Sequence, residues 1–140
     1  MNVLAKMIVI FFIGLLSFET QAQETYTITV NVEEADHNEG KMFIALYNTE
    51  TEFLKENYKG AISPLENKGA TATFEGVPEG IYAISVFHDE NDNGKMDTNF
   101  MHIPKEAYGC SNGATGFMGP PKWDDAKFEL TADKTITITL

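Results

Sequence analysis

The sequence predicts an all-β fold: an antiparallel, two-sheet, immunoglobulin-like sandwich with about seven strands and one short helix. Three observations predict it. Apolar and polar residues alternate with a period of two near both ends of the predicted domain, which is typical of half-buried strands. Turn-forming segments separate short apolar stretches, without a regular alternation of strands and long helices. The chain has 140 residues, of which 43% are hydrophobic, so it can form one domain with its own core.

The expected strands differ in how they are covered. In the first strand, Ile28, Val30 and Val32 alternate with polar residues, and the last strand repeats this pattern. We expect these two strands to pair with each other or to lie at sheet edges. Two inner strands are apolar on both faces, as in strands that are buried on both sides. The strand segments are residues 25–32, 42–47, 70–75, 81–88, 126–130 and 134–140.

The one short helix is expected over residues 50–57. Thr49 and Glu52 have the spacing of a capping box, in which the two side chains satisfy backbone N–H groups at a helix start. Residues 89–124 are expected to form a long loop between two of the strands.

The first 22 residues have the pattern of a secretory signal peptide. Lys6 provides a positive start, residues 7–18 form an apolar run, and small residues occupy two of the last three positions before the expected cleavage near Ala22. The run is shorter than the roughly 20 apolar residues of a membrane span. We therefore expect a secreted or periplasmic protein with one β-sandwich domain over residues 23–140 and no membrane span in the mature chain.

The charge balance restricts the partners. The chain has 10 lysines, no arginine and 21 acidic residues, which gives a formal net charge of −11. Nucleic acids and anionic lipids are bound through clustered cationic side chains, so this balance argues against both. An acidic chain attracts cations instead.

One segment has the spacing of a calcium loop. Residues 89–97 fit the pattern D-x-N-x-N-G-x-x-D, the first nine positions of such a loop. Alternate residues direct oxygen atoms inward, and Gly94 at position six allows the sharp turn around the ion. The expected ligands are the side chains of Asp89, Asn91, Asn93 and Asp97 and the backbone carbonyl of Lys95.

This loop departs from an EF-hand in two respects. Position twelve is Phe100 where an EF-hand has a bidentate glutamate, and a strand precedes the loop where an EF-hand has a helix. The remaining oxygens must come from water, from a backbone carbonyl, or from Glu106, Asp124 or Asp125. We expect weak binding, with a Kd on the order of 10⁻⁴ to 10⁻³ M. A metal-free turn stabilised by the short Asp and Asn side chains is the alternative interpretation.

Other polar residues are weaker candidates. His88 and His102 are conceivable as a transition-metal or acid–base pair, but His88 continues the inward face of a strand and is expected to hydrogen-bond there. Cys110 is the only cysteine, which excludes an intramolecular disulfide and favours a buried apolar role. No sequence motif of a hydrolase, a zinc protease or a phosphate-binding loop occurs. A non-enzymatic protein is therefore the expectation, and an enzyme is the less favoured alternative.

The segment of residues 116–123 is rich in aromatic residues and proline. Phe117 and Trp123, with Tyr108, provide a candidate platform for a polysaccharide or a peptide. The other interpretation, which we favour, is that the segment folds back and buries its rings over one end of a sheet. The expected partner is an envelope protein or a glycan.

The same region resembles a known family. FHDENDNGKMDTNFMHIPKEAYGCSN, followed by GFMGPPKWDDAKF, is similar to the signature of an uncharacterised secreted bacterial family, domain of unknown function 2141. FEGVPEGIYAISV also resembles the strand–turn–strand of prealbumin-like and carboxypeptidase-regulatory-like sandwiches, and the Asp/Asn loop is similar to calcium loops of bacterial surface adhesins. These resemblances imply a sandwich in the cell envelope and no assigned activity.

Overall fold

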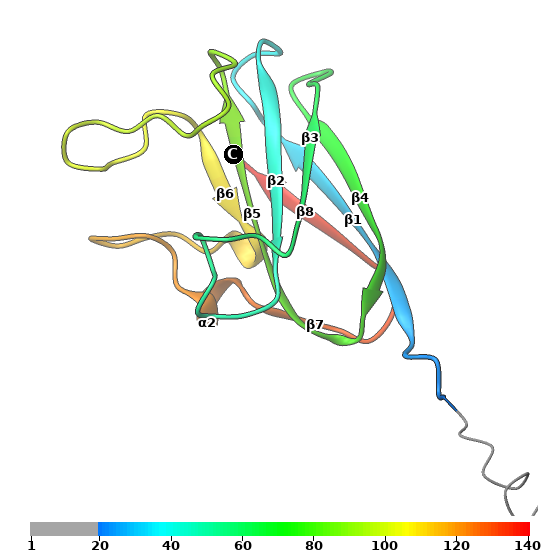
Figure 1. The fold of residues 1–140 in the computed structure, drawn as a ribbon. Helices are drawn as coiled ribbons and strands as arrows, with labels where there is room; N and C mark the ends of the chain where they lie inside the picture. The colour runs from blue at the N-terminus through cyan, green and yellow to red at the C-terminus, as the bar shows by residue number, and fades with distance from the viewer. Residues whose placement is uncertain (1–19) are drawn as a thin grey trace, which may run out of the picture.

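The computed structural model describes residues 20–140 and shows two β-sheets packed face to face (Figure 1). One sheet has three strands in the order β4-β1-β8, and the other has five, in the order β3-β2-β5-β6 with β7 also paired to β5. The predicted all-β sandwich is confirmed. The strands are β1 (Thr25–Glu33), β2 (Lys41–Tyr47), β3 (Lys59–Ser63), β4 (Ala70–Pro78), β5 (Gly80–Asp89), β6 (Tyr108–Cys110), β7 (Phe128–Leu130) and β8 (Lys134–Thr139).

The expected signal peptide lies, except for its last three residues, outside the described residues. Within residues 20–140, no helix has the length and apolar character needed to cross a membrane. The described chain starts at the end of β1 that is remote from the long loops (Figure 1).

Most strand pairs are antiparallel, but the first and last strands pair in parallel. Val30 of β1 lies opposite Ile136 of β8, while β1 and β4 are antiparallel. The expected pairing of the first and last strands is thus confirmed. β7 pairs with β5 in the five-stranded sheet and β8 with β1 in the other, so the chain changes sheets between them. This change of sheets brings the last strand beside the first.

The core lies between the sheets and follows the period of two. Ile28 and Val30 of β1 face Ile44, Ile84 and other inward residues of the opposite sheet, and all four are buried. Each such side chain contributes about 1.5–3 kcal/mol of burial free energy. The outer faces of β2 and β5 are covered only in part. Phe43, which lies on the outer face of β2, is half-buried. The expectation that these strands are covered on both sides is correct for one face only.

The helix predicted over residues 50–57 is wrong. The Thr49 hydroxyl does accept the N–H of Glu52, at 3.3 Å, but Leu54 has φ = 58° and the segment consists of turns. A left-handed residue stops a helix, so this cap begins a turn that places Phe53 against a second apolar cluster. The described residues contain a short helix elsewhere, α2 (Trp123–Ala126), and a 3₁₀ turn, η1 (Ser111–Gly113).

Candidate functional site

The Asp/Asn-rich loop begins where β5 ends. Asp89 is fully buried, and its carboxylate accepts two backbone N–H groups of the loop, from Asn93 at 3.1 Å and from Gly94 at 2.8 Å. Gly94 has φ = 79° and Asp92 has φ = 55°, so two left-handed residues produce the tight turn that brings these N–H groups back to Asp89. The Lys41 ammonium group lies 3.1 Å from the Asp92 carboxylate and ties the loop to β2.

The other predicted ligands converge on Asp97. The Asn91 amide nitrogen donates to Asp97 Oδ2 at 2.6 Å, and the Asn93 amide nitrogen donates to both carboxylate oxygens at 2.9 and 3.0 Å. These hydrogen bonds, that from Asn93 foremost, hold the pKa of the Asp97 carboxyl below its usual range, and the Lys95 and Lys105 charges act in the same direction. Lys95 N donates to Asn93 Oδ1 at 3.1 Å.

Glu106 is the distant carboxylate that joins this loop. It is buried, with 6% of its surface exposed, and it accepts the backbone N–H groups of Glu90 at 3.1 Å and Asp97 at 3.0 Å. Asp124 and Asp125, the other two carboxylates considered from the sequence, lie on α2, at the end of the sandwich remote from the loop (Figure 1). Of the three carboxylates, Glu106 is thus the one that contacts the loop, and both of its oxygens accept backbone N–H groups.

The donor set of the loop suits a hard cation. Within residues 20–140, no group of three or more His, Cys, Asp or Glu side chains is placed to hold a metal ion. A cation here would depend on the amide oxygens of Asn91 and Asn93 together with the Asp97 carboxylate. Such oxygen ligands fit calcium and not zinc or copper. The Asn91 and Asn93 amide oxygens now accept the backbone N–H groups of Asn93 at 3.3 Å and Lys95 at 3.1 Å. Coordination of a cation by these oxygens would therefore require both amides to rotate and to give up these hydrogen bonds.

The two histidines considered from the sequence have different surroundings. His88 is fully buried, and its Nε2–H donates to the backbone carbonyl of Glu39, as expected for a hydrogen-bonded strand end. Its Nδ1 is buried without a hydrogen-bond partner among the described residues. The ring that contacts it is that of His37, with centroids 4.9 Å apart, whereas His102 is exposed in the loop beyond Asp97. The sequence contained no signal for the His37 contact.

The three aromatic residues proposed as a platform lie in different surroundings. Trp123 is half-buried and forms an edge-on contact with Phe53, with centroids 5.7 Å apart. Tyr108 on β6 is 38% exposed and Phe117 is 91% exposed. No aromatic contact among residues 20–140 joins any two of the three. The expected burial is therefore correct in part for Trp123 and wrong for Phe117, because its loop closes through Gly116 and Gly119 and leaves the ring outside.

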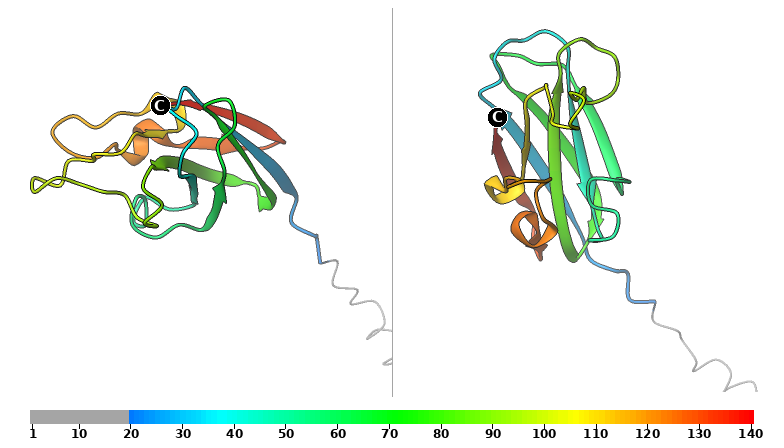
Figure 2. Two further views of the ribbon diagram at one scale, coloured as in Figure 1. Left: turned by 90° about the horizontal axis from the view of Figure 1, so that it is seen from above. Right: turned by 90° about the vertical axis from the view of Figure 1, so that its left-hand side faces the viewer.

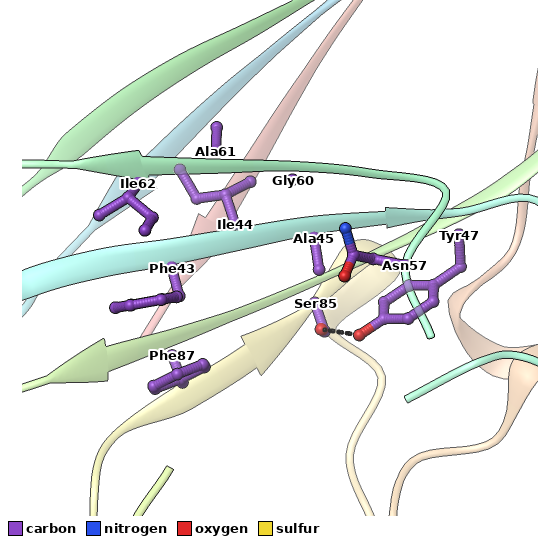
Figure 3. Close-up of a pocket in the computed structure, with 10 residues that line it drawn as sticks. All are labelled: Phe43, Ile44, Ala45, Tyr47, Asn57, Gly60, Ala61, Ile62, Ser85 and Phe87. Carbon is purple, nitrogen blue, oxygen red and sulfur yellow. Dashed lines mark hydrogen bonds between the residues drawn. The ribbon is translucent and has the colours of Figure 1, made fainter. Parts of the chain in front are cut away.

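A groove on the outer face of the five-stranded sheet was not predicted (Figure 3). It encloses about 580 Å³ between β2, β3 and β5. The Phe43 and Phe87 rings stack across it with centroids 4.8 Å apart, and the Tyr47 and Ser85 hydroxyls hydrogen-bond at 3.1 Å. Ile62 lines the groove with 59% of its surface exposed. The apolar runs of the two inner strands were a signal for this groove. Each run is apolar on both faces, and in the structure one of these faces lacks a covering layer.

Comparison with known protein families gives a match. A family model for an uncharacterised protein conserved in bacteria, domain of unknown function 2141, matches residues 30–139. No curated protein and no solved structure matches the chain.

Proposed function

The chain belongs to this uncharacterised bacterial family, and we propose that it is a secreted, non-enzymatic β-sandwich module whose Asp89–Asp97 loop binds calcium as a structural ion. One observation carries the proposal: the Asn91 and Asn93 side chains converge on the Asp97 carboxylate beside the buried Asp89. The residues have the types and the spacing of a calcium loop, and they are folded into one turn.

The loop chemistry supports a structural role for the ion. The carboxylates of Asp89 and Glu106 each accept two backbone N–H groups of the loop, so these side chains fix the chain path and do not project into a reaction site. Calcium at Asp97 would neutralise part of this crowded negative charge and hold the start of the long loop. In an extracellular setting, millimolar calcium is sufficient to occupy a site of the expected weak affinity.

The test is thermal unfolding of the protein with millimolar calcium and with a chelator, together with calorimetric titration. We expect calcium to raise the Tm of the wild type and Asp97→Asn to abolish the shift. Glu75→Gln, which removes an equal charge from an exposed position of β4, is the matched control and should keep the shift. An unchanged Tm without any heat of binding would establish the metal-free, Asx-stabilised turn instead.

Secretion is tested separately from the loop. The full chain, expressed in a bacterium, should be exported and should begin at Gln23 when its mature N-terminus is determined by mass spectrometry. A full-length product in the cytoplasm would contradict the signal peptide and leave the calcium experiment unaffected.

A polysaccharide- or peptide-binding module is the alternative function, with an envelope glycan or protein as partner. The exposure of Phe117 and the partial exposure of Tyr108 and Trp123 favour it, because aromatic rings with an accessible face stack on sugars. Trp123 is the single tryptophan, so quenching of its fluorescence by envelope glycans measures this directly. Unchanged emission across such glycans would argue against this alternative.

A further inference from the structure

Two loops project from the same side of the sandwich (Figures 1 and 2). We call them finger 1, residues 98–104, and finger 2, residues 115–120. Each finger carries a Phe-Met pair, Phe100-Met101 in finger 1 and Phe117-Met118 in finger 2. The exposed fractions are 91% and 63% for the first pair and 91% and 95% for the second. Large apolar side chains are rarely exposed to this degree in pairs, so the fingers are candidates for an interaction surface.

The backbone of finger 1 holds its apolar side chains outward. A bridge between Thr98 and Pro104 closes its base, and the Asn99 carboxamide oxygen accepts the N–H groups of Met101 at 2.8 Å and Ile103 at 3.1 Å. Ile103 adds a third exposed apolar side chain, at 52%. The exposure thus follows from a hydrogen-bonded turn that fixes the direction of the tip.

Finger 2 is closed in a different way. Gly116 lies so close to Gly119 that a Cβ at Gly116 would come within 1.9 Å of the Gly119 carbonyl oxygen. Met118 has φ = 55°, and Pro120 and Pro121 follow. The tight turn and the two prolines present Phe117 and Met118 to solvent.

Charge is distributed unevenly between the fingers and the rest of the chain. Of the 21 acidic residues, only Glu106 lies within residues 98–123, and it is buried. Within residues 98–123, the exposed charges are Lys105, after finger 1, and Lys122, after finger 2. Outside this segment, Asp97 directly precedes finger 1, and Asp124 and Asp125 lie exposed on α2. The fingers are therefore apolar at their tips, and a lysine follows each of them, although acidic residues border the segment and the whole chain has a net charge of −11.

We propose that the two fingers insert into the surface of a phospholipid bilayer. The tips enter the boundary between headgroups and acyl chains, and Lys105 and Lys122 lie at the depth of the lipid phosphates, where ammonium groups are attracted. Insertion by a few side chains gives reversible attachment and no membrane span. This proposal is independent of calcium binding by the neighbouring loop.

The shape and chemistry of the fingers favour lipid over a protein groove or a sugar. The tips are separate. The exposed side chains at the tip of finger 2, Phe117 and Met118, are apolar without hydrogen-bonding groups, and finger 1 adds one exposed polar ring, His102, beside its apolar side chains. A sugar platform needs polar groups beside the ring to bind hydroxyls. A fluid bilayer requires only apolar area and accepts two separated tips, and the lysines match its phosphate layer.

The test places an environment-sensitive fluorophore at each tip of the full chain. Met101→Cys and Met118→Cys are labelled one at a time, and Ile62→Cys on the outer face of β3 is the control. Cys110 is buried and does not compete for the label. A local reporter distinguishes finger insertion from binding through the apolar run of residues 7–18, because β1 begins at the opposite end of the domain (Figure 1). On phosphatidylcholine vesicles, both tip probes should shift to the blue and become protected from iodide, and the control should not.

Substitutions measure the contributions of the tips and the lysines. Phe100→Ser and Phe117→Ser should each weaken partitioning of the tip probe on the other finger on the order of tenfold, whereas Ile62→Ser should not. Added phosphatidylglycerol should strengthen binding, and Lys105→Gln with Lys122→Gln should remove that increment. Tip probes that do not respond to vesicles would overturn the proposal. So would a response to glycans alone, or probe shifts that follow self-association measured by sedimentation.

Discussion

Glu106 and Asp97 are joined through side chain and backbone: the Glu106 carboxylate accepts the Asp97 N–H at 3.0 Å and the Glu90 N–H at 3.1 Å. A buried carboxylate that binds two backbone groups connects both arms of the Asp/Asn loop. Glu106→Ala leaves both N–H groups without this charged acceptor, so we expect it to lower the free energy of unfolding by about 2 kcal/mol. Urea denaturation measures the change.

Two further variants serve as controls for Glu106→Ala. Glu106→Gln keeps one carbonyl acceptor and should lose less than the alanine variant. Glu129→Ala, at an exposed position of β7, should stay within about 0.5 kcal/mol of the wild type. If Glu106→Ala unfolds at the same urea concentration as the wild type, the two hydrogen bonds do not stabilise the loop.

The lowered pKa of Asp97 makes a prediction about acid stability. The Asn93 amide, and then the Asn91 amide, stabilise the charged carboxylate. A carboxyl with a lowered folded-state pKa stabilises the fold above its unfolded-state pKa, and this contribution is lost as the pH falls through the folded-state value. We expect Asn93→Ala to raise the Asp97 pKa toward its ordinary value and to reduce the loss of stability below about pH 4.

Titration of the carboxyl carbons by NMR follows this change residue by residue. Asp124 is an internal control, because the Lys127 ammonium group lowers its pKa through a separate contact. The Asp124 value should be the same in both proteins. If the Asp97 pKa is the same in Asn93→Ala as in the wild type, the hydrogen bond from the Asn93 amide is not the main cause of the lowered pKa.

The fold was predictable where a strand repeats its pattern over several residues. The alternation in residues 25–32 and 134–140 found β1 and β8, because one face of each is buried and the other is not. β3 was missed because Lys59–Ser63 is short and only half-buried, and β6 because its three residues lie inside a loop. The prediction of a helix over residues 50–57 was wrong. The expected capping contact forms, but Leu54 then adopts a left-handed conformation that ends the helical turn.

The candidate site was predictable only within one local stretch. The spacing of residues 89–97 anticipated that Asn91 and Asn93 meet Asp97, because a nine-residue turn determines its own contacts. Which of the three carboxylates contacts this stretch depends on the path of the long loop. The sequence of that loop has no hydrophobic periodicity from which the path could be predicted. Exposure of Phe117 depends on the same path.

Cys110 should be unreactive in the folded protein. The side chain is 2% exposed, and burial raises the pKa of its thiol to about 11. At pH 8 the thiolate population in the folded protein is lower on the order of 100-fold than in the unfolded chain. Alkylation by iodoacetamide should therefore be slow until urea unfolds the protein, and equal rates in both states would contradict the buried position.

The same shift has a defined sign at high pH. A raised folded-state pKa means that the folded thiol keeps its proton where the unfolded one has lost it. The contribution to stability is complete below the unfolded-state pKa of 9.0 and declines as the pH rises toward about 11. Cys110→Ala should remove this component of the alkaline decline, which denaturation at pH 8 and pH 10.5 measures.

Gly40 and Gly94 allow a matched test of the contact beneath the loop. Both have positive φ, 77° and 79°, so alanine at either position costs roughly 1–2 kcal/mol in backbone strain. A Cβ at Gly40 would also lie 2.0 Å from the backbone carbonyl oxygen of Asp89, whereas one at Gly94 meets nothing within 4 Å. We expect Gly40→Ala to destabilise the protein by about 1–3 kcal/mol more than Gly94→Ala, because the end of β5 must move. Equal unfolding free energies for the two variants would mean that the β1–β2 connection does not press on Asp89 and that the loop is positioned from its own residues alone.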